Sequence, residues 1–336
     1  MKRGLFALLT TLLPLWAIYA QTPDLDRAAS LSAQVVKLYQ ANKPAEGLPL
    51  AKEALALREK GLGAEHPLTG AALHNLASLY WRLGDLKMAA PPAQRALAIL
   101  EQAKPCNEAS LAGTLTLLGG ILYAVADFEQ AALHFQRALT IRENLSGPEH
   151  PETLDLVITL ANTYKNAGQT DSAEFLYRAY IETQTRRGGP VADTGYALER
   201  LSCLLRVKGT VKEAEALEKR SDTLLGYGGP FLQAKPRELR EKQLSRPEVN
   251  IVLDKKYLNA FSYFREGEIG VRLLLNEQGE PLRACAFFGP PFLFAFYENA
   301  ARRTKFSPFT VNRQPVKASG ELHYIYEVET MRQRKN

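Results

Sequence analysis

The sequence is poor in the residues that most often bind metals or act as nucleophiles. Its 336 residues include only three cysteines and five histidines. No histidine has a second ligand-type residue at the spacing of a metal site; the five are His66, His74, His134, His150 and His323. The cysteines are too few and too scattered for a disulfide framework or a metal cluster; they are Cys106, Cys203 and Cys285. An odd count leaves at least one thiol free unless it pairs between chains. Cys203, within an apolar helical run, is expected to be a small core or groove residue.

The motifs of the common enzyme classes are also missing from the sequence. It contains no glycine-rich phosphate loop, no Gly-x-Ser-x-Gly turn and no Cys-x-x-Cys pair. Acidic residues are dispersed along predicted helices, where solvent contact or helix pairing explains them. We therefore predict a protein that is not an enzyme, with no catalytic residue, cofactor or metal. The alternative is a catalytic triad assembled from distant positions.

One apolar stretch stands out, at the N-terminus. Lys2 and Arg3 precede apolar residues 5–18, and the small Ala20 follows where a signal peptidase would cut. This pattern predicts a signal peptide over residues 1–20. The stretch is shorter than the roughly 20 apolar residues of a membrane span, and a proline interrupts it. We expect a periplasmic or secreted protein. The alternative is an anchored protein facing the periplasm, which contacts the membrane only through this retained segment.

The positive charge is too small to indicate nucleic-acid binding. The formal net charge is +6, from 42 Lys and Arg against 36 Asp and Glu, which favours solubility and weak attraction to acidic surfaces. From Asn299 onward, eight basic residues stand against three acidic ones, so much of the surplus lies near the C-terminus. We expect protein or peptide partners and no nucleic acid.

Internal repeats organise the first two thirds of the chain. The segment that starts at Leu76 recurs at Leu118, Leu160 and Leu201, with spacings of 42, 42 and 41 residues. Eight residues after each leucine comes a small residue, at Gly84, Ala126, Gly168 and Gly209. Five residues further on there is always an alanine, at Ala89, Ala131, Ala173 and Ala214. Apolar spacing within each segment is helical, and we expect these small side chains where two helices pack closely.

Histidine–proline pairs mark the connections between the predicted helix pairs. Glu65-His66-Pro67 recurs 84 residues later as Glu149-His150-Pro151, and proline suits the first turn of a helix. The pattern of His-Pro, Leu-Ala-x-x-Tyr, Gly and Ala-Leu resembles the kinesin-light-chain type of tetratricopeptide repeat. The resemblance covers about residues 24–225 and implies an all-α superhelix, a solenoid of helical hairpins that binds proteins or extended peptides. The first copy departs from it, with Asn42 at the glycine position, as terminal repeats often do.

The first helix of each pair usually lines the concave surface of such a solenoid, so its repeated positions should form stripes. One column reads Trp81, Tyr123, Lys165 and Arg206, and a second reads Ser78, Gly120, Asn162 and Cys203. We predict that an extended peptide contacts five of these residues, with acidic groups near the last two: Trp81, Tyr123, Asn162, Lys165 and Arg206. The alternative is a solvated helix face with one or two packed aromatic residues.

The composition changes after Leu225, where glycine and proline break the helical pattern. We interpret residues 226–262 as a linker that includes one short helix. From Ile269 to Leu275, apolar residues alternate, which predicts a strand with one buried face. A second strand over about 281–287, a helix to about 304 and a last strand over about 316–328 follow. The order is strand, strand, helix, strand.

That order, with the Glu-Gln-Gly-Glu turn at 277–280 and the Ala-x-x-x-Lys-Phe-Ser-Pro run at 301–308, resembles the C-terminal domain of the TonB family. The resemblance gives a small α+β domain over residues 263–330. It implies binding of a short extended segment of a membrane transporter by strand addition to a sheet edge, with the last strand as the candidate edge. Asn312-Arg313 stands where that family usually has a glycine.

These parts together predict an exported adaptor that binds one partner in the repeat groove and another by strand addition to the sheet. The partners would be an outer-membrane transporter segment or another envelope protein. One alternative is a TonB-like component of outer-membrane transport, retained by its N-terminal segment. A third hypothesis is a regulatory subunit of a catalytic partner.

Overall fold

The computed structural model describes residues 23–227, 232–243 and 266–327. The chain forms two compact units, Met1–Cys106 and Asn107–Asn336, which are described separately. The predicted signal peptide lies outside the described residues. Within the described ranges, no helix is both long enough and apolar enough to cross a membrane.

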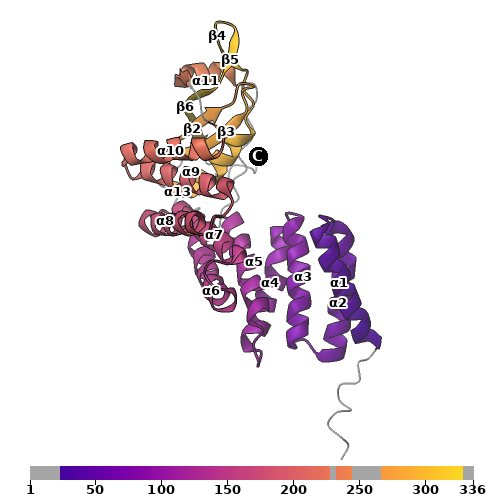
Figure 1. Cartoon of the computed structure of the whole chain (residues 1–336). Helices are drawn as coiled ribbons and strands as arrows, with labels where there is room; N and C mark the ends of the chain where they lie inside the picture. Colours follow the sequence, from indigo (N-terminus) through magenta and orange to yellow (C-terminus); the bar gives the residue numbers. More distant parts are fainter. Residues whose placement is uncertain (1–22, 228–231, 244–265, 328–336) are drawn as a thin grey trace, which may run out of the picture. The chain divides into compact units, whose positions relative to one another are not determined.

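The first unit contains two helical hairpins (Figure 1). In the first hairpin, α1 (Pro23–Gln40) packs against α2 (Pro44–Leu62). In the second, α3 (Pro67–Arg82) packs against α4 (Leu86–Gln102). Three of these helices begin with proline, whose missing N–H would have no helical partner in the first turn. Packing is close because the buried positions of α4 include several fully buried alanines.

The second unit continues with three more hairpins. They are α5 (Glu108–Ala124) with α6 (Phe128–Ser146), α7 (Pro151–Asn166) with α8 (Thr170–Arg186), and α9 (Val191–Val207) with α10 (Val211–Leu224). These described helices confirm the predicted solenoid of helical hairpins, with the period that the sequence shows.

The two repeated positions with small residues, one mostly glycine and one alanine, require small side chains for different physical reasons. The alanines at 89, 131, 173 and 214 have no exposed surface, which confirms close helix packing at these positions. At Gly84 and Gly209, however, an added Cβ would meet nothing within 4 Å, so packing does not require glycine there. Their φ angles are +77° and +81°, and Asn42 at the corresponding position has a φ of 57°. The glycine column therefore serves a left-handed turn between the two helices of a hairpin, which corrects our explanation by packing.

The histidine–proline pairs start helices, as their position predicts. His66 precedes α3 and His150 precedes α7, and in each case proline is the first helical residue. The His66 Nδ1 accepts a hydrogen bond from the backbone N–H of Leu68 at 3.1 Å. The His150 Nδ1 accepts one from the N–H of Glu152 at 3.3 Å. Each histidine thereby satisfies an N–H group that has no partner within the helix.

A small sheet with two helices, here called the C-terminal module, completes the second unit. It contains β1 (Leu232–Ala234), α11 (Pro236–Lys242), β2 (Glu266–Leu275), β3 (Pro281–Phe288), α13 (Pro291–Arg303), β4 (Phe309–Val311), β5 (Gln314–Val316) and β6 (Ala318–Glu327). The four-stranded sheet has the order β1-β6-β2-β3, and β4 and β5 form a separate hairpin. The predicted order of strand, strand, helix and last strand is confirmed.

Two sequence interpretations of this region need correction. First, the stretch that we assigned to a linker contributes β1, which pairs in parallel with the start of β6, from Leu232 opposite Ala318 to Ala234 opposite Gly320. Second, β6 is therefore not a simple edge strand. Its side opposite β2 is covered by β1 over residues 318–320, and no described strand pairs with that side over residues 321–327.

The sheet is covered on both faces. Ile269, Val271 and Leu273 of β2 share a core with Phe294 of α13 and Leu239 of α11. On the opposite face, Leu274 and Cys285 are only 3% and 1% exposed. β3 contacts α9 of the repeat array there. The alternation that predicted one buried face thus marks a strand between two packed layers.

Candidate functional site at the junction of array and module

The five residues predicted to contact a peptide fall into both units. Trp81 is half-buried on α3 in the first unit. Tyr123, Asn162, Lys165 and Arg206 lie in the second unit, on the first helices of its three hairpins. Each of these four is engaged in contacts within the chain, so the prediction that a partner peptide touches them stays a prediction.

Tyr123 and Asn162 belong to a polar network between the hairpins. The Tyr123 hydroxyl accepts a hydrogen bond from Asn166 Nδ2 at 2.7 Å. Burial, with a smaller contribution from the negative charge of Glu298, raises the pKa of Tyr123 to about 12. Asn162 Oδ1 accepts from the Tyr177 hydroxyl at 2.6 Å and from Arg200 Nη1 at 3.1 Å. This network fixes the side chains of α7 against the neighbouring helices.

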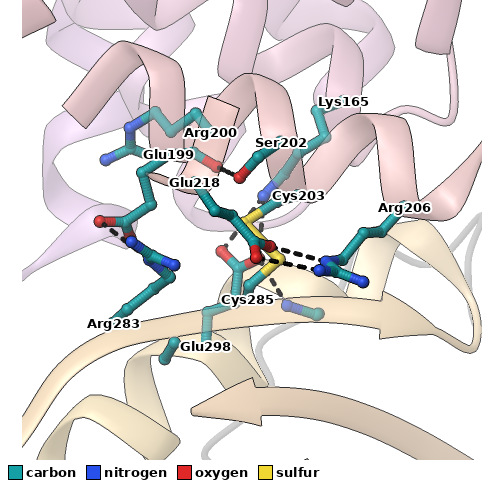
Figure 2. The surroundings of a disulfide bond; sticks show 12 residues. Lys165, Glu199, Arg200, Ser202, Cys203, Arg206, Glu218, Arg283, Cys285 and Glu298 are labelled. Carbon is teal, nitrogen blue, oxygen red and sulfur yellow. Dashed lines mark hydrogen bonds and ion pairs between the residues drawn. A yellow bond between two sulfur atoms is a disulfide. The ribbon is translucent and has the colours of Figure 1, made fainter. Parts of the chain in front are cut away.

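Lys165 meets a carboxylate that comes from outside the array. Its Nζ donates to both oxygens of Glu298 on α13, at 3.0 and 3.1 Å (Figure 2). The side chains of Lys165 and Glu298 are only 5% and 12% exposed. Glu298 Oε1 also accepts from the backbone N–H of Ala286 on β3, at 3.0 Å. One carboxylate thus joins α13, a strand of the sheet and the first helix of a repeat.

The outer edge of β3 is capped by side chains of α13. Besides the contact of Glu298 with the Ala286 N–H, Arg302 Nη2 donates to the carbonyl of Ala284 at 3.2 Å. These are backbone groups that an added strand would need. The same Arg302 nitrogen lies 3.1 Å from Glu199 Oε1 of α9. Strand addition at this edge is therefore blocked in the structure.

Further charged side chains meet where α9 and α10 face the sheet (Figure 2). Arg283 of β3 pairs with Asp222 of α10, and its Nε lies 3.8 Å from Glu199 Oε2. Arg206 donates from Nε and Nη2 to the two oxygens of Glu218, at 2.6 and 2.9 Å. Burial opposes ionisation of Glu218, but the hydrogen bond and charge of Arg206 lower the pKa of this carboxyl below its usual value.

A cavity of about 380 Å³ lies beside these pairs, between α10 and the sheet. Its lining includes Glu215, Lys219 and Arg272 along with Glu218 and Arg283. Positive and negative groups are mixed, and several already pair with each other. The lining therefore matches a polar junction between two layers better than a site for a ligand of one charge.

A disulfide bond links the array to the C-terminal module. Cys203 on α9 bonds to Cys285 on β3, with 5.6 Å between their Cα atoms and 82 residues between them in sequence. Cys106 has a free, exposed thiol. This bond corrects the expectation that Cys203 is only a small core or groove residue, although its place in the same repeat column as Asn162 puts it on the predicted groove side. Its partner could not be inferred without knowing which strand faces that column.

The junction consists of buried ion pairs, a polar network and one disulfide. Within the described residues, no three His, Cys, Asp or Glu side chains are grouped so that they could hold a metal ion. Fold and site together define a helical-hairpin repeat protein whose array carries a docked α+β module.

Comparison with known proteins supports this class. Residues 18–102 and 110–186 match the tetratricopeptide repeat family model, so the chain contains tetratricopeptide repeats. No match was found among curated proteins.

A solved repeat structure shows the same fold in the array. The nearly identical repeats of a kinesin-light-chain candidate from Podosopora anserina share 22% identity with this chain, cover 62% of it and 98% of their own length, and superpose with a TM-score of 0.53. BtubC from P. vanneervenii is 19% identical, with coverage of 70% and 99% and a TM-score of 0.45. Tetratricopeptide scaffolds generally mediate protein–protein interactions and are generally non-catalytic.

Proposed function

We propose that the protein is an exported, non-catalytic adaptor. Its repeat array binds an extended, acidic segment of one partner, and its TonB-like module binds another partner by strand addition. The observation that carries this proposal is the ion pair of Lys165. A lysine of the predicted stripe receives a carboxylate from a segment that is not part of the array. The surface therefore has the chemistry to accept an acidic ligand.

The open side of β6 supports strand addition as the second binding mode. The outer edge of β3 is capped by Glu298 and Arg302. Over residues 321–327, by contrast, no described strand pairs with β6 on the side away from β2. An extended segment added there would gain main-chain hydrogen bonds, and alternate side chains would provide selectivity. A segment of an outer-membrane transporter or of another envelope protein is the proposed ligand.

Export is proposed from the N-terminal sequence, and the disulfide supports it. Disulfides persist mainly in oxidising compartments such as the periplasm or the cell exterior. N-terminal sequencing of the protein from cell fractions tests the proposal. A start at Gln21 in the soluble envelope or culture fraction supports export. Retention of Met1 in the membrane fraction would favour the alternative, a TonB-like transport component that keeps its N-terminal anchor.

Site-specific photo-crosslinking in cells tests the two binding surfaces. A photoreactive phenylalanine analogue is placed at Trp81 in the predicted stripe or at Glu321 on the open half of β6. Phe175 on α8, which is 71% exposed and outside both columns, serves as the matched control. We expect discrete protein cross-links from positions 81 and 321, to different partners. Cross-links that form equally from position 175, or from neither test position, would show that these surfaces do not bind partners.

A further inference from the structure

We infer that the C-terminal module occupies the binding face of its own array and is locked there by the Cys203–Cys285 disulfide. Reduction of this bond would release the face of α7 and α9 for an acidic segment of a partner. The inference rests on the proposed function, because it treats this face as a binding surface.

The module occupies the same positions that the repeat columns assign to a ligand. Lys165 belongs to the first column and contacts Glu298 of α13. Cys203 belongs to the second column and bonds to Cys285 of β3. An extended peptide that followed both columns along α7 and α9 would overlap the module. The module and a partner segment therefore cannot contact these residues at the same time.

The module has its own core and does not depend on the array to bury most of its apolar residues. Leu293, Tyr297 and Ala301 of α13, spaced at i, i+4 and i+8, are buried against the sheet. Glu298 and Arg302, also four residues apart, instead reach α7 and α9. Charged groups that separate can be hydrated again, so buried ion pairs contribute less to net association than their contacts suggest. Such an interface can open while both parts stay folded.

Noncovalent contacts alone would let the module dissociate from the array and dock again, and the disulfide prevents this dissociation. Its two cysteines are 4% and 1% exposed, so a reductant reaches the sulfur atoms only through local fluctuations of the junction. A dithiol reductant then attacks one sulfur as a thiolate, breaks the S–S bond and forms a mixed disulfide. Its second thiol displaces the remaining cysteine. Cys203 and Cys285 end as two thiols, having gained two electrons and two protons, and the reductant ends as a disulfide.

Release would also determine which partner binds. When Glu298 leaves, Lys165 loses the carboxylate that its Nζ contacts and remains on α7, the helix that also carries Asn162. A segment that supplies a carboxylate at this point restores the lost pair. The geometry therefore points to an extended segment with an acidic side chain as the replacement ligand.

The full chain is compared in three states: oxidised, reduced with dithiothreitol, and as the variant Cys203→Ala/Cys285→Ala/Glu298→Gln. Cys106→Ser, which removes only the exposed thiol, is the matched control. Two quantities are measured. One is the acetylation rate of Lys165, by mass spectrometry, relative to Lys60, whose side chain is 76% exposed. The other is the affinity for a fluorescein-labelled peptide of alternating glutamate and alanine, by anisotropy. Circular dichroism verifies that the helices remain folded.

We expect both quantities to rise on opening by about 10- to 1,000-fold, the range given by a closed state that opens 0.1–10% of the time. Cys106→Ser should behave like the wild type. Equal Lys165 reactivity in all three states would overturn the inference. If the triple variant does not fold, the dithiothreitol-treated wild type decides the question. If Lys165 becomes reactive but the peptide binds in no state, the module is released as inferred and the proposed groove function is wrong.

Discussion

The pair formed by Lys165 and Glu298 allows a sharp stability prediction. At 3.0 Å and an effective dielectric constant of about 20, the two charges attract each other by about 5–6 kcal/mol. Removing both ions from water costs several kcal/mol each, so the intact pair contributes little net stability. Removing one partner is different, because the remaining charge stays buried without compensation. Lys165→Met should therefore destabilise the second unit by about 3–5 kcal/mol.

A double variant separates this effect from general damage to the packing. In Lys165→Met/Glu298→Leu both charges are replaced by apolar side chains of similar volume, and most of the lost stability should return. Urea unfolding of the full chain followed by circular dichroism measures the change. With a slope of about 2–3 kcal/mol/M, the single variant should lower the midpoint by about 1–2.5 M.

The first unit provides an internal control for this experiment. In a chain that starts at Gln21, Trp81 is the single tryptophan, so its fluorescence follows the first unit. The midpoint seen by fluorescence should shift less than the one seen by circular dichroism. A cost below about 1 kcal/mol for the single variant, or a double variant as unstable as the sum of both singles, would refute the reasoning.

Three further outcomes follow from local features of the structure. Gly209→Ala forces alanine into a φ of +81° and should cost about 1–2 kcal/mol, seen as a lower thermal midpoint. His150→Ala removes the hydrogen bond to the start of α7 and should cost about 0.5–2 kcal/mol in urea unfolding. The folded-state pKa of Glu218 lies below its usual value of 4.5, so its contribution is present above that pH and is lost as the pH falls through the lower folded pKa. Glu218→Gln should therefore flatten the dependence of stability on pH in the acid range, as urea midpoints measured across that range would show.

The array could be predicted from sequence because its information is local and repeated. Four copies contain the turn residue, the buried alanine and the helical apolar spacing, so these four hairpins repeat the same structural information. Even the atypical first copy fits, since Asn42 takes the left-handed conformation that glycine takes elsewhere. What the sequence did not distinguish was the reason for each small residue. Turn geometry and close packing both select small side chains, and only the surrounding atoms separate the two causes.

The C-terminal module was predicted less completely because part of it depends on distant pairing. β1 is only three residues long, too short for its alternation to identify a strand, and it becomes a strand by pairing with β6. The second buried face of the sheet depends on α9, and nothing in the alternation of β2 reveals that neighbour. The sequence analysis predicted an acidic group of a bound peptide near Lys165, and in the structure Glu298 of the same chain lies there. That the acid belongs to the same chain could not be predicted, because residues 165 and 298 meet only when array and module are packed together.

Disulfide mapping tests the central claim, that the module is fixed on the binding face of the array, most directly. The full chain is purified without reductant, its free thiols are blocked with iodoacetamide, and non-reduced tryptic peptides are analysed by mass spectrometry. The account predicts one linked pair of peptides containing Cys203 and Cys285, with alkylated Cys106. Alkylation of all three cysteines, or a link between Cys106 and either of the others, would contradict it.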